Sequence, residues 1–253
     1  MNLRYTLVEV ARISREAGQL ILDEQKNGLT ITTKSDGTSV SSADMAAHRF
    51  IIMELTKRYP SIPAISEEGD LESGERADRY WLIDPLDGTK GFIDNTGTYT
   101  VNIALIDKDT PILGVIYNPL DRTTYGAAAG EGFFKQIGDG TPEFLVQQPV
   151  DRPYTVIMSP SVISGPLGPF LSDLEAKKGP FDLIKIESSI KFCYLADGRA
   201  DIYPRLGHTS QWDIAAGHAL LLETGKDIYV YDTGKPLRYD RCGGFLNPFF
   251  FAA

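Results

Sequence analysis

One segment near the middle of the chain restricts the fold most, because an apolar run leads directly into two carboxylates. Residues 80–83 are apolar throughout, which is typical of a short strand buried on both faces. Asp84 ends this run, Pro85 fixes the φ angle that follows, and Asp87 comes three residues after Asp84. Such a turn can direct both carboxylates and the Leu86 carbonyl oxygen at one point. Read alone, the segment also fits a simple turn without a ligand.

Helices and strands are expected to alternate along the rest of the chain. Helical spacing of apolar residues predicts helices over 3–26, 43–58, 189–196 and 211–224. A hairpin is predicted over 99–106 and 112–118, with further strands near 30–33, 124–128, 132–136, 155–158, 183–186, 200–204 and 228–231. The length of 253 residues suits a mixed α/β (α+β) protein. We expect an N-terminal lobe over residues 1–150 and a C-terminal lobe over 151–253, joined in one compact catalytic unit.

The formal net charge of −9 argues against a nucleic-acid polymer or an acidic membrane as partner. A protein this acidic that handled a phosphate would need bound divalent cations to attract it. The sequence lacks an apolar run long enough to span a membrane, and its first residues lack the apolar core of a secretion signal, so we expect a cytoplasmic location. Cys193 and Cys242 form no paired metal spacing, which argues against a zinc site or a disulfide framework.

Further acidic residues stand where expected elements begin or end. Glu67 follows an apolar segment, while Asp44 and Asp213 lie in the first turns of expected helices. Taken singly, each fits a solvated charge, a helix cap or a favourable interaction with a helix dipole. Taken together, they add oxygen ligands of the kind that Mg²⁺ prefers. Gly88 and Thr89, at an expected helix start, could hold a phosphate through unpaired N–H groups.

Together, the motifs of this chain resemble those of the inositol monophosphatase superfamily in order and approximate spacing. They are residues 34–44 (KSDGTSVSSAD), 65–68 (ISEE), 81–89 (WLIDPLDGT) and 212–216 (WDIAA). The resemblance covers essentially the whole chain and implies a layered αβαβα sandwich with the site in a cleft between the two halves. It also implies a phosphomonoesterase that uses two or three Mg²⁺ ions, with Mn²⁺ as a substitute, and that lithium inhibits.

Within the superfamily, the chain is most similar to the 3'(2'),5'-bisphosphate nucleotidases. This similarity rests on residues 188–193 (SSIKFC), 200–205 (ADIYPR) and 246–248 (LNP), and on Thr209 with Trp212 and Asp213. It implies a small phosphorylated substrate, either 3'-phosphoadenosine 5'-phosphate or a related 3'-phosphonucleotide. Homodimers occur in the superfamily, so the resemblance leaves both a monomer and a homodimer open.

The resemblance assigns roles to individual residues. The implied metal ligands are Glu67, Asp84, the main-chain carbonyl of Leu86, Asp87 and Asp213. The implied catalytic residues, which position or deprotonate the attacking water, are Asp44, Glu67 and Thr89. The implied substrate contacts are Gly88, Thr89, Ser188, Ser189, Lys191, Arg205 and Asp213, among which Lys191 and Arg205 would hold a second phosphate.

Two departures from the nucleotidase pattern leave the substrate open. Glu187 stands where glycine is usual, and its carboxylate could repel a second phosphate. Val162 replaces a histidine that is associated with nucleotide binding. An inositol, sugar or specialised-metabolite monophosphatase of the same fold is therefore one alternative. A catalytically silent ligand-binding homologue is another, although it would have no physical reason to keep so many mutually repelling acids.

Overall fold

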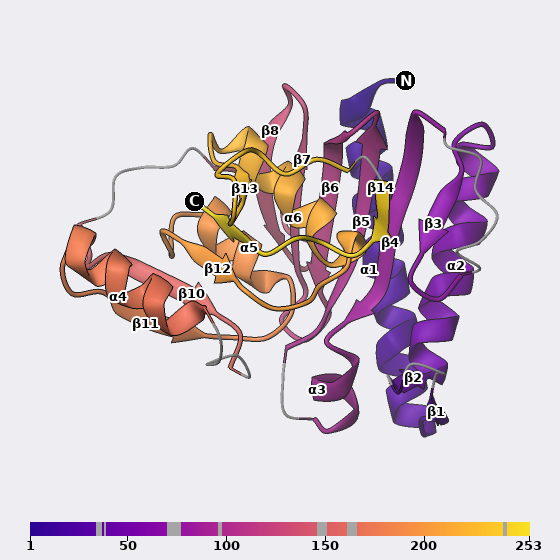
Figure 1. Cartoon of the computed structure of the whole chain (residues 1–253). Coiled ribbons are helices and arrows are strands. Elements are labelled where there is room, and N and C mark those ends of the chain that lie inside the picture. Colours follow the sequence, from indigo (N-terminus) through magenta and orange to yellow (C-terminus); the bar gives the residue numbers. More distant parts are fainter. Residues whose placement is uncertain are drawn as a thin grey trace.

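A seven-stranded sheet forms the centre of the molecule (Figure 1). The computed structural model describes residues 1–33, 37, 39–69, 77–95, 98–145, 151–160, 166–239 and 242–253. In spatial order the strands of the sheet are β3 (Ala64–Ser66), β4 (Arg79–Asp87), β5 (Thr100–Asp107), β6 (Thr110–Asn118), β7 (Thr123–Ala128), β8 (Gly132–Ile137) and β9 (Glu143–Phe144). β3 and β4 run parallel, and the other neighbours run antiparallel. β5 and β6 confirm the predicted hairpin.

Helices cover both faces of this sheet. α1 (Leu3–Asn27) and α2 (Ser42–Arg58) pack on one face, and α5 (Ile190–Ala196) and α6 (Gln211–Glu223) pack on the other (Figure 1). Beyond α5 and α6 lie two smaller sheets and the helix that forms the outer layer. These elements are β10 (Thr155–Met158) with β11 (Asp182–Lys185), β12 (Tyr203–Arg205) with β15 (Phe250–Ala252) and β13 (Ile228–Val230), and α4 (Leu167–Lys178). The predicted αβαβα layering is confirmed.

Alternate residues of β4 point into two separate cores. Tyr80 and Leu82 belong to the core under α5 and α6, whereas Trp81 and Ile83 belong to the core under α1 and α2. Burial on both faces explains why residues 80–83 of this strand are all apolar. The core under α5 and α6 also contains many residues of the predicted C-terminal lobe. The predicted lobe boundary at residue 150 lies outside the described residues and stays a prediction.

The structure departs from the predicted elements at several points. β4 does not end at Asp84 but continues to Asp87, with a register shift against β5 between these two acids. The strand predicted over 200–204 is shorter and lies at Tyr203–Arg205, and α4 was not predicted because Gly168 and Pro169 near its start are typical of a turn. The remaining elements are β1 (Ile31–Thr33), β2 (Ser39–Ser41), α3 (Thr89–Ile93) and β14 (Cys242–Phe245).

Some features singled out in the sequence lie outside the described residues, namely residues 34–36 and 38 of the first motif and Val162. Within the described ranges, no helix combines the length and the apolar character that crossing a bilayer requires.

α6 packs closely on the central sheet and on α5 because glycine stands at both contacts. A methyl group on Gly114 of β6 would overlap the carbonyl oxygen of Ala216, and one on Gly217 would overlap the ring of Phe192. Asp213 lies in the first turn of the same helix. The close approach of α6 therefore sets where this predicted metal ligand lies.

We expect Gly114→Ala to lower the free energy of unfolding by about 1–3 kcal/mol, because the added methyl group overlaps backbone atoms of α6. Urea unfolding followed by circular dichroism measures the change. Gly168→Ala is the matched control, since a methyl group there meets no atom of the described residues within 4 Å and alanine favours the helix. If Gly114→Ala were as stable as the wild type, this account of α6 packing would be wrong.

Candidate metal and phosphate site

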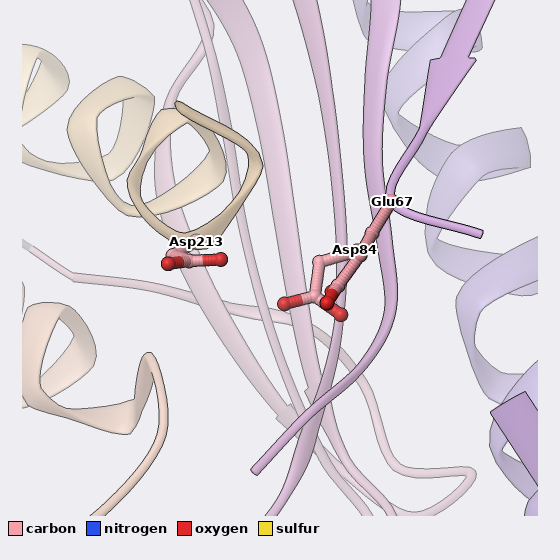
Figure 2. A group of neighbouring side chains, drawn as sticks. All are labelled: Glu67, Asp84 and Asp213. Carbon is pink, nitrogen blue, oxygen red and sulfur yellow. The ribbon is translucent and has the colours of Figure 1, made fainter. Parts of the chain in front are cut away.

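Three carboxylates from distant parts of the sequence converge in the structure. One carboxylate oxygen from each of Glu67, Asp84 and Asp213 lies within 4.8 Å of the other two. Figure 2 shows Glu67 beside Asp84, with Asp213 opposite them at the start of its helix. Glu67 directly follows β3, and Asp84 lies in β4. The structure thus brings together three of the predicted metal ligands, taken from both halves of the chain.

Backbone hydrogen bonds hold these acids in place. The Glu67 N–H donates to the carbonyl of Ile83 (3.1 Å), which brings Glu67 beside Asp84. Asp213 belongs to the capping box of α6, where its Oδ2 accepts a hydrogen bond from the Ser210 N–H (2.8 Å). A capping role and a position beside the other acids therefore both hold for Asp213.

Burial and mutual repulsion oppose ionisation of these carboxyl groups. Burial raises the pKa of Asp84 well above its usual range, and the negative charge of Glu67 raises it further. Burial also raises the pKa of Asp213 well above its usual range, and repulsion from the Asp87 carboxylate raises it further. Hard divalent cations bind carboxylate oxygens and offset such repulsion. The donor set therefore fits Mg²⁺ or Mn²⁺.

Asp87 and the Leu86 carbonyl lie in the next turn of chain and are held by other contacts. Asp87 is not part of the closely spaced trio, and its Oδ2 accepts a hydrogen bond from Ser189 Oγ (2.6 Å). The Leu86 N–H donates to Asp84 Oδ1 (3.0 Å), and the Leu86 carbonyl accepts from Thr89 Oγ1 (3.0 Å). The roles of Asp87 and Leu86 as metal ligands stay predictions.

Asp44 is both a helix cap and a neighbour of the site. Its Oδ2 accepts hydrogen bonds from the N–H (2.8 Å) and the hydroxyl (2.6 Å) of Ser41 at the start of α2. Its Oδ1 lies 2.9 Å from Thr89 Oγ1. Asp44 is buried, so these contacts fix both of its oxygens. The structure places Asp44 and Thr89 in direct contact.

The main chain turns sharply at Gly88 before α3 begins at Thr89. Gly88 has a φ of 98°, and a Cβ atom there would lie 2.8 Å from the carbonyl oxygen of Thr98. A residue with a side chain would therefore be strained at this position. The predicted helix start at Thr89 is confirmed, and the first N–H groups of a helix have no partner within the helix itself.

A cavity of about 190 Å³ opens beside the carboxylates and is lined from both halves of the chain. The first half contributes Asp87 and Gly88, and the second contributes Ser188, Ser189, Lys191 and Arg205. Asp213 also lines this cavity, and so does Glu187, the residue that departs from the nucleotidase pattern. The predicted substrate contacts other than Thr89 therefore gather in one pocket next to the predicted metal ligands.

Lys191 is a buried cation in this pocket. It is 4% exposed, and its Nζ donates hydrogen bonds to the carbonyls of Ser188 (2.5 Å) and Ile186 (3.3 Å). Burial lowers the pKa of Lys191 to about 8, and the nearby charges of Asp87 and Arg205 act on it in opposite directions. Within the described residues, no carboxylate forms an ion pair with it. A buried ammonium of this kind suits an anionic ligand.

Arg205 forms another wall of the pocket. Its guanidinium donates hydrogen bonds to Ser159 Oγ (3.1 Å) and to the main-chain carbonyl of His208 (2.9 Å). The ring of His208 packs near Phe249. The guanidinium is thus held by neutral groups and keeps its positive charge available to the pocket.

Asn102 belongs to this site although the sequence analysis did not identify it. It is fully buried in β5, and its Nδ2 donates a hydrogen bond to Ser189 Oγ (3.0 Å). The available signal was a single amide within the otherwise apolar residues 101–106. A polar residue that interrupts a buried strand needs a partner, and here that partner lies in the pocket.

Comparisons with known proteins agree with this geometry. The inositol monophosphatase family matches residues 3–248 of the chain. The 3'(2'),5'-bisphosphate nucleotidase CysQ of Escherichia coli (strain K12) is 40% identical over 248 residues, which cover 96% of this chain and 98% of the relative. The crystal structure of CysQ from Bacteroides thetaiotaomicron matches with a TM-score of 0.85 at 32% identity and covers 99% of this chain and 97% of that one.

A more distant structure shows the same fold. Inositol monophosphatase from Anabaena matches with a TM-score of 0.75 at 22% identity and covers 100% of this chain and 92% of that one. The resemblance inferred from the motifs, including the similarity to the bisphosphate nucleotidases, is confirmed by these matches. The chain belongs to the inositol monophosphatase family.

Proposed function

We propose that this protein is a Mg²⁺-dependent phosphomonoesterase and that it acts as a 3'(2'),5'-bisphosphate nucleotidase. The observation that carries the proposal is the convergence of Glu67, Asp84 and Asp213 beside a pocket that contains Lys191 and Arg205. An acidic cage suits cations and a basic pocket suits a phosphate, and the two lie next to each other. The similarity to relatives named as bisphosphate nucleotidases supports the choice of substrate class.

We assign the metal-binding role to five oxygen donors, from Glu67, Asp84, the Leu86 carbonyl, Asp87 and Asp213. When bound, two or three Mg²⁺ ions supply Lewis acidity at the phosphoryl group and make a water molecule a better nucleophile. Mn²⁺ also binds carboxylate, carbonyl and water oxygens, so we expect it to substitute for Mg²⁺. Inhibition by lithium remains a prediction from the family resemblance.

Thr89 and Asp44 are placed to handle the proton of the attacking water. The Thr89 hydroxyl donates toward Asp44 Oδ1 (2.9 Å) or the Leu86 carbonyl (3.0 Å), so a lone pair on Thr89 Oγ1 remains for a water molecule. Glu67 or Asp44 accepts the proton that this water loses. The N–H groups of Gly88 and Thr89, at the start of α3, hold the phosphoryl oxygens.

Lys191 and Arg205 distinguish a bisphosphate from a monophosphate. Both line the pocket from the second half of the chain, where they are placed to neutralise a phosphate that is not being cleaved. Ser188 and Ser189 add hydroxyl groups to the same wall. Glu187 lines this pocket too, and its negative charge is the specific observation that favours the alternative, a monophosphatase for an inositol or a sugar.

The proposed cellular setting follows the sequence predictions. A cytoplasmic location, and the choice between a monomer and a homodimer, remain predictions. The substrate is a small phosphorylated molecule, and neither a nucleic-acid polymer nor a membrane is part of the proposal.

Phosphate release from a panel of substrates tests the proposed function. With Mg²⁺ present, we expect the highest kcat/KM for 3'-phosphoadenosine 5'-phosphate, because only this substrate engages the metal site and both basic residues. Inositol 1-phosphate and a sugar phosphate complete the panel. A higher kcat/KM for either of these would favour the monophosphatase, and tight binding without turnover would favour the silent homologue.

The pKa of Lys191 predicts how substrate affinity depends on pH. Because burial lowers this pKa to about 8, the ammonium is charged below that pH and neutral above it. We therefore expect KM for 3'-phosphoadenosine 5'-phosphate to rise from pH 7 to pH 9 by about tenfold relative to 3'-AMP, which lacks the second phosphate. Steady-state kinetics at constant ionic strength measures both values.

Lys191→Arg is the matched variant, because arginine stays charged over this range. It should keep the preference for the bisphosphate but lose the change in KM between pH 7 and pH 9. Identical pH profiles for wild type and Lys191→Arg would show that Lys191 does not bind the second phosphate.

A further inference from the structure

We propose that Asn102 is a positioning residue that orients Asp87 through the hydroxyl of Ser189. The inference rests on the proposed function, because it takes Asp87 as a cation ligand. Neither the motifs nor the pattern of acidic residues points to Asn102.

The sheet places Asn102 next to the acidic site. In the register of β4 and β5, Asn102 lies directly opposite Asp84. Side chains at directly opposed positions leave the sheet on the same face, so Asn102 points to the face that carries Asp84. Asn102 is 0% exposed, and water therefore does not compete for its amide group.

The contacts of Ser189 fix which way the Asn102 amide points. Ser189 Oγ lies 2.6 Å from Asp87 Oδ2, 2.6 Å from the main-chain carbonyl oxygen of Asp213, and 3.0 Å from Asn102 Nδ2. A carbonyl oxygen and an ionised carboxylate only accept hydrogen bonds, whereas a hydroxyl has a single proton to donate. The third neighbour must therefore be a donor, and Asn102 supplies it through its NH₂ group.

This donation restricts the Ser189 hydroxyl. With one lone pair engaged by Asn102, the single proton of Ser189 is restricted to the side of Asp87 Oδ2 and the Asp213 carbonyl, which compete for it. Asp87 comes from the end of β4, while Asp213 lies in the first turn of α6, so one hydroxyl contacts both parts of the site. Without the amide, the hydroxyl is free to rotate about χ1, and Asp87 loses a fixed partner.

The Oδ1 atom of Asn102 lowers the stability of the fold. It is buried and has no hydrogen-bond partner within the described residues. An unpaired buried acceptor destabilises the fold, and an apolar residue of similar volume would avoid that cost. The hydrogen bond to Ser189 is thus the feature that requires an amide at this position. A residue kept at a cost in stability is typical of a functional site.

Direct metal titration of the whole chain tests the proposal. We expect Asn102→Leu to weaken Mn²⁺ binding by about tenfold, measured by electron paramagnetic resonance of free Mn²⁺. Its free energy of unfolding in EDTA should equal or exceed that of the wild type, because the unpaired Oδ1 is removed. A merely structural role predicts the reverse, namely lower stability with unchanged Mn²⁺ affinity.

A double-mutant cycle tests whether Asn102 affects Mn²⁺ binding through Ser189. If Asn102 acts through Ser189, then Ser189→Ala weakens Mn²⁺ binding by a similar factor, and adding Asn102→Leu to it causes no further loss. Thr124→Val is the matched control: Thr124 lies in β7, is also fully buried, and its hydroxyl has no partner among the described residues, so this variant should leave Mn²⁺ affinity unchanged. Asn102→Val repeats the test with a smaller side chain if leucine prevents folding.

Two results would overturn the proposal. One is a Mn²⁺ affinity within about twofold of the wild type for both Asn102 variants. The other is a double variant whose loss of Mn²⁺ affinity is the product of the losses of Asn102→Leu and Ser189→Ala. If the wild type binds Mn²⁺ and hydrolyses substrate while either result is obtained, only this inference fails. If the wild type itself binds no Mn²⁺, the metal site of the proposed function fails, and this inference fails with it.

Discussion

Repulsion among buried carboxylates is the constraint on which the rest of this site depends. Carboxylates removed from water are costly unless an opposite charge compensates them, and here the neighbours of each acid include further acids. The fold prevents them from moving apart. Leu86 holds Asp84, Ser210 holds Asp213, and Ser41 holds Asp44, in each case through a backbone N–H group. Cations bound among these oxygens would offset the repulsion.

In this protein, a helix-capping role does not exclude a role as metal ligand for the same carboxylate. Asp213 closes the capping box of α6 with one oxygen while its carboxylate stays near Glu67 and Asp84. Asp44 closes the capping box of α2 in the same way, and its other oxygen contacts the Thr89 hydroxyl. A helix N-terminus also carries a partial positive charge, which favours a carboxylate there. The caps therefore position the acids and partly offset their repulsion at the same time. Because α6 packs closely on the sheet, the geometry of the site depends on the packing of both halves.

The sequence could predict those parts of the site that are close along the chain. Asp84, Leu86, Asp87 and Gly88 occupy one short segment, so their relative placement follows from a strand and a turn. The strand was predicted to end at Asp84 because the apolar run of residues 80–83 stops there. It continues to Asp87 because the register shift against β5 accommodates the turn within the sheet.

Contacts between distant segments could not be predicted from local pattern. The order of the motifs placed Asp213 near the other acids only through family resemblance, since nothing in residues 211–216 specifies where α6 packs. Asn102 was missed because its partner Ser189 lies far along the chain, and only the packing of α5 on the central sheet brings the two together. α4 was missed although Leu167, Phe170, Leu171 and Leu174 have helical spacing, because Gly168 and Pro169 between them are typical of a turn.

Thermal unfolding of wild type and Asp84→Asn, with Mg²⁺ and with EDTA, tests the central claim most directly. Asparagine keeps the acceptor for the Leu86 N–H but removes one buried negative charge. The account predicts that the wild type gains stability with Mg²⁺, and that in EDTA its Tm falls below that of Asp84→Asn, whose own Tm responds little to Mg²⁺. A wild-type Tm that is the same in Mg²⁺ and EDTA and exceeds that of the variant in both would contradict it.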